Sequence, residues 1–581
     1  MYHILCVVIF TLSFVFVSTD RVVRTTTGKV RGTTVELPDG NQVEAFLGIP
    51  FAEPPVGKLR FEKPVPIRHW EGEYNATFLP PPCYQNYTIK FYWTPDVERM
   101  TEDCLYLNIW VPGSVQETKP KAVFVWIYGG AFNVGSSELD LYNGAILASR
   151  GNMVVISFNY RVGMFGFLTT SIPEAKGNMG MFDQILALKW IKANVHFFGG
   201  NSELITLAGE SAGAMSAALF LLSPVTRGMV KRVILQSGGI IHPMSTHLKA
   251  TMFKVAEQVS LFTGCSNNNV SLTTNPKIVI DCLKNLPPNA ISEAEGLLMK
   301  IFPITASPYS GEDFMPRNPT DMLIDGDFQD TEVLFGCNRD EGSNFLVFVA
   351  PEYFGIYGAG APTMRKRLSA YIIKTIFERT EQKNNTRDIV RFYVEGRGNR
   401  KLRNEGSDDG DETDYFKTAI YDSIGDYMIL CPTVFNADFM SVREKPVYFY
   451  MFTHRPSTTL NAKWMGATHF DEVPFVFGRP LSDDKNYTEE DKTISQRMMD
   501  RWIAFTKTGN PNIEGEIEWP HYKWNEPLYL DINAEEKIKL KPDDYRCEFW
   551  RARFGSTLDH FRSDTNVDTS IGTVSTKKVP F

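Results

Sequence analysis

One stretch constrains this chain of 581 residues more than any other. Residues 204–208 form a short apolar run typical of a buried strand, and they lead directly into Gly209-Glu-Ser211-Ala-Gly213, after which small residues suit the start of a tightly packed helix. A strand, a Gly-x-Ser-x-Gly turn and a helix are typical of a nucleophile elbow, in which a strained turn lifts a serine hydroxyl out at the head of a helix. We therefore predict that Ser211 is a nucleophile. The alternative is a glycine-rich turn that carries a solvent-exposed serine.

Apolar, strand-like runs recur along the chain and alternate with helical patterns. They lie at 121–128, 153–158, 204–208, 230–236, 332–335 and 447–452. Near-continuous apolar strands between helices indicate a sheet that is covered on both faces. Residues 22–46 instead alternate polar and apolar between glycine turns, which predicts antiparallel hairpins at one sheet edge. The sequence thus predicts an α/β-hydrolase fold, with a large central, mostly parallel mixed sheet flanked by helices, in a single domain over residues 20–562.

The two ends of the chain differ from this domain. Residues 1–19 are apolar and end in small residues, which favours a cleaved signal peptide, although an uncleaved signal anchor is an alternative because the charged n-region is poor. Residues 563–581 are rich in Ser, Thr, Asp and Lys, which predicts a disordered tail without a lipid-anchor signal. No later stretch is apolar enough to cross a bilayer. We expect a secreted, extracellular protein with no stable membrane anchor.

The charge and the glycosylation motifs agree with this expectation. A net charge of −8 and a pI of about 5.7 argue against nucleic acid or an anionic membrane as partner, and they are compatible with a cationic substrate. Asn-x-Ser/Thr motifs predict N-glycosylation in surface loops. They begin at Asn75, Asn86, Asn269, Asn384 and Asn486.

The cysteines indicate a disulfide framework. Eight cysteines less Cys6 of the predicted signal leave seven, so one is expected to be free. Six cysteines allow 15 pairings in principle. Local spacing favours Cys83–Cys104 and Cys265–Cys282, which leaves Cys431–Cys547 as a long-range pair and Cys337 as a buried thiol.

A serine nucleophile needs a base, and the base needs a carboxylate that orients it. In this fold the chain order is serine, acid, histidine, which excludes every histidine before the elbow. Asp340 and Glu341 both directly follow an apolar strand, so both are candidate acids. His469, in a loop after the strand at 447–452, is the preferred base, and His454, which abuts the same strand, is its competitor.

The oxyanion hole is expected to combine the N–H after the nucleophile with N–H groups from an earlier glycine-rich loop. Residues 126–132 contain such a loop after a strand. The predicted donors are Gly130, Ala131 and Ala212. The alternative reading of the loop is an ordinary glycine-rich strand end.

Six longer motifs stand in a specific order between about Val22 and Phe554. They are Thr101-Glu-Asp-Cys-Leu-Tyr-Leu-Asn-Ile-Trp-Val-Pro112, Tyr128-Gly-Gly-Ala-Phe132, Gly177-Asn-Met-Gly-Met-Phe-Asp-Gln184, Phe198-Gly-Gly-Asn201, Gly209-Glu-Ser-Ala-Gly213 and Asp340-Glu-Gly-Ser343. Together they resemble the type-B carboxylesterase/cholinesterase family. The resemblance implies Ser211 as nucleophile, Glu341 as acid and His469 as base, the three oxyanion donors named above, and the three disulfides named above. It makes Asp340 a neighbour of the acid.

The resemblance also implies a cation pocket of the kind that cholinesterases use for choline. Trp93, inside the 83–104 loop, stands in a similar Trp-x-Pro setting, and Glu210, Tyr142 and Phe345 join it as implied substrate contacts. The alternative for Trp93 is a side chain packed under its own loop. A cation held over an indole ring is stabilised by about 2 kcal/mol or more once it is desolvated.

Several positions depart from the vertebrate cholinesterase pattern. Asn133 and Asn344 replace aromatic side chains, Met244 replaces a tryptophan behind the acyl pocket, Phe470 replaces a glycine, and residues 301–303 fall where the acyl-pocket phenylalanines are expected. These changes suggest a roomier acyl pocket.

The predicted function is a secreted serine hydrolase of choline esters that acts through an acyl-enzyme. It requires no metal and no organic cofactor, its partner is a small and cationic ester, and it is a monomer or a non-covalent homodimer. A broad-specificity carboxylesterase is the alternative within the same class. A catalytically inactive, neuroligin-like adhesion protein is the alternative of another class, and the presence of all three residues of the Ser-Glu-His set argues against it.

Overall fold

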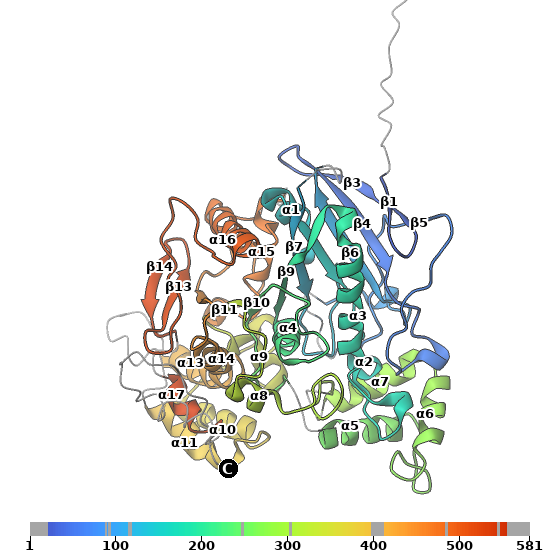
Figure 1. Ribbon diagram of the computed structural model, residues 1–581. Coiled ribbons are helices and arrows are strands. Elements are labelled where there is room, and N and C mark those ends of the chain that lie inside the picture. The colour runs from blue at the N-terminus through green and yellow to red at the C-terminus, as the bar shows by residue number, and fades with distance from the viewer. Residues whose placement is uncertain are drawn as a thin grey trace, which may run out of the picture.

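An eleven-stranded mixed sheet organises the described part of the chain (Figure 1). The computed structural model describes residues 21–87, 90, 94–113, 119–245, 249–300, 305–396, 412–482, 486–542 and 546–554. In spatial order the strands are β14 (Lys537–Leu540), β13 (Leu528–Ile532), β12 (Val447–Phe452), β11 (Glu332–Asn338), β10 (Arg232–Gln236), β9 (Gly200–Glu210), β7 (Lys121–Ile127), β8 (Val154–Phe158), β6 (Tyr106–Pro112), β4 (Gln42–Pro50) and β3 (Thr33–Glu36).

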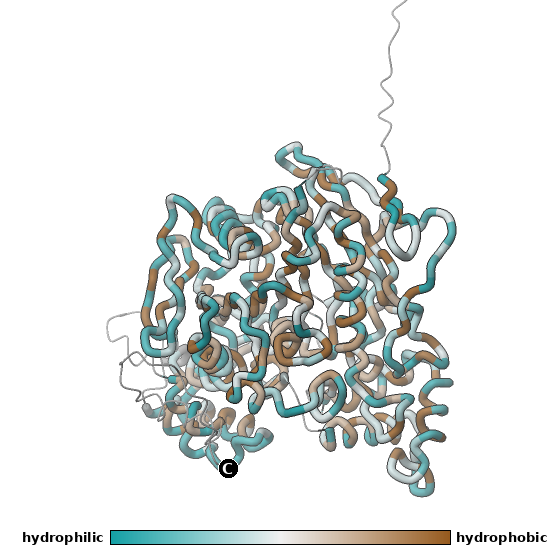
Figure 2. The backbone as a smooth tube through the Cα atoms, viewed as in Figure 1, coloured by the Kyte–Doolittle hydropathy of each residue, from teal (hydrophilic) through white to brown (hydrophobic). Residues whose placement is uncertain are grey.

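The central strands are parallel and the edges are antiparallel. From β8 to β13 every neighbouring pair is parallel, whereas β3–β4, β4–β6, β6–β8 and β13–β14 are antiparallel. Every residue of β7, β8, β10 and β12 is buried. Because successive side chains of a strand point to opposite faces, both faces of this sheet must be covered. Figure 2 agrees, with hydrophobic segments concentrated along the interior strands.

Helices supply that cover. α1 and α16 pack on each other, α16 also contacts β7 and β9, and α4 packs on β7, β9 and β10. The helices are α1 (Ala145–Gly151), α2 (Gly163–Phe167), α3 (Met179–Asn194), α4 (Ala212–Leu222), α5 (Lys249–Phe262), α6 (Pro276–Asn285), α7 (Pro288–Met299), α8 (Pro319–Asp325), α9 (Gly342–Val349), α10 (Lys366–Phe377), α11 (Thr386–Val390), α13 (Glu412–Gly425), α14 (Cys431–Met440), α15 (Val473–Val476), α16 (Glu489–Thr508) and α17 (Arg546–Arg551).

A smaller hydrophobic core lies beside the main one, under α2, α5, α6 and α7 (Figure 1). It contains Met164 and Phe165 of α2, Val255 and Val259 of α5, and Ile291 of α7. The Cys265–Cys282 disulfide closes this region. The other disulfides are Cys83–Cys104 and Cys431–Cys547, and Cys337 is a buried free thiol, so the predicted cysteine pattern is confirmed.

The predicted fold class is confirmed, and all six predicted central strands are present. One detail of the N-terminal prediction is wrong. The hairpin β3–β4 does form one edge of the large sheet, but β1 (Val22–Arg24) pairs with β2 (Lys29–Arg31), and β2 pairs with β5 (Glu73–Asn75), in a separate three-stranded sheet. Local alternation predicts a hairpin but not the sheet that it joins, because this choice depends on contacts with distant residues.

The remaining predictions about ends and surfaces fall partly outside the described residues. These include the signal segment 1–19, the tail 563–581, Trp93 and residues 301–303. Within the described ranges, no helix combines the length and hydropathy needed to cross a membrane. Of the predicted glycosylation sites Asn86 is only half-buried rather than exposed, whereas the other four asparagines are exposed: Asn75, Asn269, Asn384 and Asn486.

Candidate active site

The turn between β9 and α4 has the strained geometry of a nucleophile elbow. Ser211 adopts φ 54° and ψ −124°, a conformation that is unfavourable for a residue with a side chain, and its N–H donates to the Gln236 carbonyl at 2.8 Å. A Cβ at Gly213 would lie 2.0 Å from the Ile127 carbonyl oxygen, and one at Gly209 would lie 2.5 Å from the Gly213 backbone. Glycine at both positions therefore lets β7, β9 and α4 meet closely enough to form the turn.

The glycine-rich loop after β7 lies directly against this turn. A Cβ at Gly129 would lie 2.9 Å from the Ser211 Cβ. Three successive residues have left-handed backbones, with φ of 111° at Gly130, 54° at Ala131 and 59° at Phe132. In the described part of the chain, the N–H groups of Gly130 and Ala131 donate to no protein acceptor. The structure thus places two available donors beside Ser211, and such strain is characteristic of functional loops.

The N–H of Ala212 is a third donor at this place. Ala212 is the first residue of α4, so its N–H has no acceptor within the helix. The N-terminus of a helix also carries a partial positive charge, which favours an anion. The three predicted oxyanion donors are thus contributed by the elbow and the adjacent loop.

The predicted acid and base meet at the carboxyl ends of β11 and β12. His469 Nδ1 donates to Glu341 Oε2 at 2.6 Å. The other carboxylate oxygen of Glu341 accepts from the Ser237 hydroxyl at 2.6 Å and from the Asn338 N–H at 2.7 Å. Since β9, β10, β11 and β12 are neighbours and parallel, their carboxyl ends share one edge, which brings residues 211, 237, 341 and the histidine loop together.

A second carboxylate faces the other nitrogen of the imidazole. His469 Nε2 lies 3.0 Å from Glu210 Oε1, and the Glu210 side chain is 2% exposed. Burial lowers the pKa of His469, but the charges of Glu210 and Glu341 and their hydrogen bonds outweigh it and raise the pKa well above its usual value. Burial raises the pKa of Glu210, and the His469 charge opposes this increase. The imidazole therefore lies between two carboxylates that favour its cationic form.

Ser211 and His469 are adjacent to the same groups but are not hydrogen-bonded to each other. Among the described residues, Nε2 is directed to Glu210, and no hydrogen bond joins it to Ser211 Oγ. In unliganded enzymes the catalytic hydrogen bonds are often loose and tighten only when substrate binds. The arrangement can serve proton transfer from the serine after a rotation of the imidazole from Glu210 toward Oγ.

The two competing candidates from the sequence have other partners. His454 Nε2 lies 2.7 Å from Asp491 Oδ1, in the capping box at the start of α16. Asp340 Oδ2 accepts from the Ala467 N–H at 2.9 Å, and a Cβ at Gly466 would lie 2.1 Å from the same oxygen. Asp340 therefore holds the loop that carries His469.

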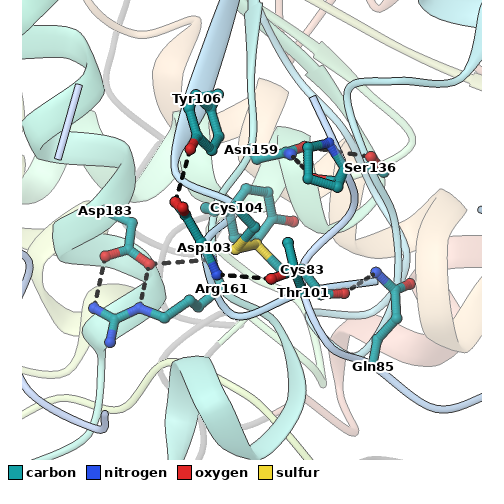
Figure 3. The surroundings of a disulfide bond; sticks show 12 residues. Cys83, Gln85, Thr101, Asp103, Cys104, Tyr106, Ser136, Asn159, Arg161 and Asp183 are labelled. Carbon is teal, nitrogen blue, oxygen red and sulfur yellow. Dashed lines mark hydrogen bonds and ion pairs between the residues drawn. A yellow bond between two sulfur atoms is a disulfide. The ribbon is translucent and has the colours of Figure 1, made fainter. Parts of the chain in front are cut away.

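The predicted cation pocket is only partly described. Trp93 lies outside the described residues, but Figure 3 shows Cys83, Cys104 and Gln85 at the base of its loop. The side-chain amide of Gln85 accepts from the Gly135 N–H at 2.7 Å and donates to the Gly135 carbonyl at 2.9 Å. The Cys83–Cys104 loop is thereby hydrogen-bonded to the end of the glycine-rich loop that follows β7. The same view contains the buried pair of Arg161 and Asp183, whose charged atoms lie 2.7 Å apart.

Tyr142 and Phe345 both pack against the histidine loop. The buried Tyr142 ring packs against Trp126, Phe470 and Phe477, with centroids 5.8, 6.1 and 5.9 Å away. The Phe345 ring lies 5.0 Å from the His469 ring. Phe470, one of the departures, thus fills space beside Tyr142, and its φ of 82° shows why glycine also suits this position.

The other departures also have defined contacts. The Asn344 amide donates to the His469 carbonyl at 3.2 Å, and the Met244 carbonyl accepts from the Ser307 hydroxyl at 3.0 Å. Asn133 is buried and donates to Glu295 at 3.0 Å. The two polar replacements therefore make contacts around the candidate site: Asn344 with the histidine loop, and Asn133 behind the glycine-rich loop that follows β7.

Sequence reasoning missed residues beneath the acid and the base. Ser237 and Asn338 hold Glu341, as described above. Glu472 accepts from Gln236 at 3.0 Å and from Asn338 at 2.5 Å, and burial raises its pKa to about 8. The signal for Ser237 was its position after a predicted strand and before two glycines. Glu472 had no such signal, because its burial results from the packing of three separate segments.

The comparisons with known proteins agree with this geometry. The carboxylesterase family model matches residues 19–550. A cholinesterase of Mus musculus is 36% identical over 561 residues, which cover 93% of this chain and 88% of the relative. An acetylcholinesterase of Bungarus fasciatus is 38% identical over 545 residues (91% and 85%), and acetylcholinesterase-1 of Trittame loki is 34% identical over 545 residues (92% and 94%). The chain belongs to the carboxylesterase family, and it is a serine carboxylic ester hydrolase.

Proposed function

We propose that this enzyme hydrolyses choline esters through an acyl-enzyme on Ser211. His469 Nε2 takes the hydroxyl proton as Oγ attacks the ester carbonyl, and the same proton then leaves with the alcohol. Glu341 accepts the Nδ1–H and stabilises the imidazolium. The N–H groups of Gly130, Ala131 and Ala212 stabilise the tetrahedral oxyanion, and water repeats the sequence to release the acid.

One observation carries the proposal: the strained Ser211 turn, the two available loop N–H groups and the Glu341–His469 pair at 2.6 Å lie at one edge of the sheet. The choline part rests on different support. Glu210 is a buried carboxylate next to the nucleophile, and the relatives named above are cholinesterases by name. Tyr142 and Phe345 border the same region, and Trp93 is the proposed cation–π partner.

A kinetic comparison tests the substrate class. We expect kcat/KM to be higher for acetylthiocholine than for the uncharged isosteric thioester, in which a tert-butyl group replaces the trimethylammonium. Trp93→Ala should lower the ratio of the two kcat/KM values about 30-fold, which corresponds to the 2 kcal/mol of a desolvated cation–π contact. Trp70→Ala is a matched control, because the Trp70 indole N–H donates to the Lys29 carbonyl of β2, in the separate β1–β2–β5 sheet.

Two results would contradict the proposal. Equal kcat/KM values for the charged and uncharged esters would favour a broad-specificity carboxylesterase. Asn133 and Asn344, which replace aromatic side chains of the vertebrate cholinesterases, would agree with that outcome. Retention of hydrolysis by Ser211→Ala would overturn the mechanism itself. We further propose secretion, N-glycosylation and a monomeric or non-covalent dimeric state. Export of the protein from expressing cells tests secretion, and a mass decrease after glycosidase treatment tests glycosylation. Light scattering measures the molar mass in solution and so tests the oligomeric state.

A further inference from the structure

A second buried carboxyl group lies behind the oxyanion loop, and the ester mechanism above does not use it. Glu295 of α7 is 1% exposed. One carboxyl oxygen accepts from the Asn133 amide at 3.0 Å and from the Thr305 hydroxyl at 2.8 Å. The other accepts from the Met164 N–H of α2 at 3.1 Å. Glu295 thus joins the glycine-rich loop, α2 and the segment after α7.

The contact with the loop is direct. Asn133 follows the three left-handed residues 130–132, and its N–H donates to the Gly130 carbonyl at 3.0 Å, which closes the turn that presents the Gly130 and Ala131 N–H groups. The Phe132 carbonyl accepts from the Gly163 N–H at 2.8 Å. A Cβ at Gly163 would lie 2.5 Å from Glu295. The carboxyl group therefore contacts both sides of the junction between the loop and α2.

We propose that Glu295 is a positioning residue of ester hydrolysis, which holds the oxyanion loop through Asn133 and the start of α2. This inference rests on the proposed role of Gly130 and Ala131 as oxyanion donors. Because a strained loop returns to its productive geometry only when its surroundings impose it, loss of this contact reduces transition-state stabilisation more than substrate binding.

The ionisation of Glu295 changes this contact. The groups that face it from the loop, from α2 and from the segment after α7 are the neutral Asn133 amide, Met164 N–H and Thr305 hydroxyl. Burial raises the pKa to about 7, against the effect of these hydrogen bonds. The carboxylate accepts all three donors, whereas the protonated acid must itself donate one hydrogen bond.

Asn133 supplies an acceptor for that proton. In the described structure its amide oxygen is buried and has no hydrogen-bond partner. Rotation of the amide directs this oxygen to the protonated carboxyl group and removes the amide donor from it. Protonation of Glu295 therefore rearranges the Asn133 side chain, which immediately follows the oxyanion loop. Activity is expected to decrease as the pH falls, because Glu295 is protonated, and this effect is separate from the protonation of His469.

The test uses the full-length enzyme and p-nitrophenyl acetate, an uncharged ester, so that it does not depend on choline specificity. Glutamine at position 295 has one donor group and one acceptor group, as the protonated acid does. We expect the ratio of wild-type kcat to Glu295→Gln kcat to be about two at about pH 6, where about a tenth of Glu295 is ionised, and to rise to about tenfold at about pH 8.5, with KM changed less than twofold. The His469 titration is common to both enzymes and cancels in the ratio.

Glu293→Gln is the matched control, because Glu293 is exposed on the same helix; its ratio should stay near one at every pH. Asn133→Ala should lower kcat at high pH. When Glu295→Gln is added to Asn133→Ala, the ratio of kcat before to kcat after the addition should no longer depend on pH. A ratio that is independent of pH, or an effect on KM alone, would overturn the role of Glu295 while leaving the proposed function intact. Hydrolysis by Ser211→Ala would instead overturn both.

Discussion

Removal of the Glu210 charge tests whether two carboxylates set the basicity of His469. Glu210 lies 3.0 Å from Nε2, and at an effective dielectric constant of about 20 a unit charge at this distance stabilises the imidazolium by about 5 kcal/mol. Burial raises the pKa of Glu210 and so opposes its ionisation, which makes this figure an upper limit. We expect Glu210→Gln to lower the pKa of His469.

The sign of the effect on activity follows from the role of the base. In the proposed mechanism His469 must be neutral to accept the Ser211 proton, and its raised pKa keeps it cationic up to a higher pH. Glu210→Gln should therefore move the acidic limb of the kcat/KM profile to lower pH. The assay is the hydrolysis of an uncharged ester between about pH 5 and 9, which avoids the separate effect of Glu210 on a cationic substrate.

Glu203→Gln is the control, because Glu203 lies on the same strand but is exposed and 3.6 Å from Lys192. It should leave the profile unchanged. If the acidic limb of Glu210→Gln stays in place or moves to higher pH, the reasoning that Glu210 raises the pKa of His469 is refuted.

Two further predictions concern the elbow and the framework. Gly213→Ala should lower kcat more than 100-fold, because the added Cβ would lie 2.0 Å from the Ile127 carbonyl oxygen and force the turn apart. Thermal unfolding and ester assays of the same sample distinguish a loss of activity from a loss of folding. A fully active variant would show that the turn relaxes, which would contradict this prediction. Cys431→Ser with Cys547→Ser should lower the free energy of unfolding by about 4–5 kcal/mol, because the disulfide joins residues 116 apart in the sequence. Denaturant titration measures this loss, and a change below about 1 kcal/mol would contradict the loop-closure argument.

The alternation of apolar runs with helices was sufficient to predict the fold class and the six central strands. Such runs require burial on both faces, and few architectures provide it. The elbow was also predictable, because a strand, two glycines and a helix restrict the backbone locally. The disulfide pattern needed only cysteine spacing and the odd count. The separate β1–β2–β5 sheet was not predicted, because the pairing of β2 with β5 depends on residues more than 40 positions apart in the sequence.

The sequence by itself determined the elbow, the order of the Ser, Glu and His motifs, and the glycines that bring the oxyanion loop against Ser211. The tertiary structure decided which carboxylates act on which groups. Only the fold places Glu210 opposite Glu341 across the His469 ring, buries Glu472 below them, and brings Glu295 of α7 to Asn133 behind the oxyanion loop. The physical reason is that the charge state and the hydrogen bonds of a carboxyl group depend on burial and on neighbours distant in sequence, whereas backbone turns depend on adjacent residues.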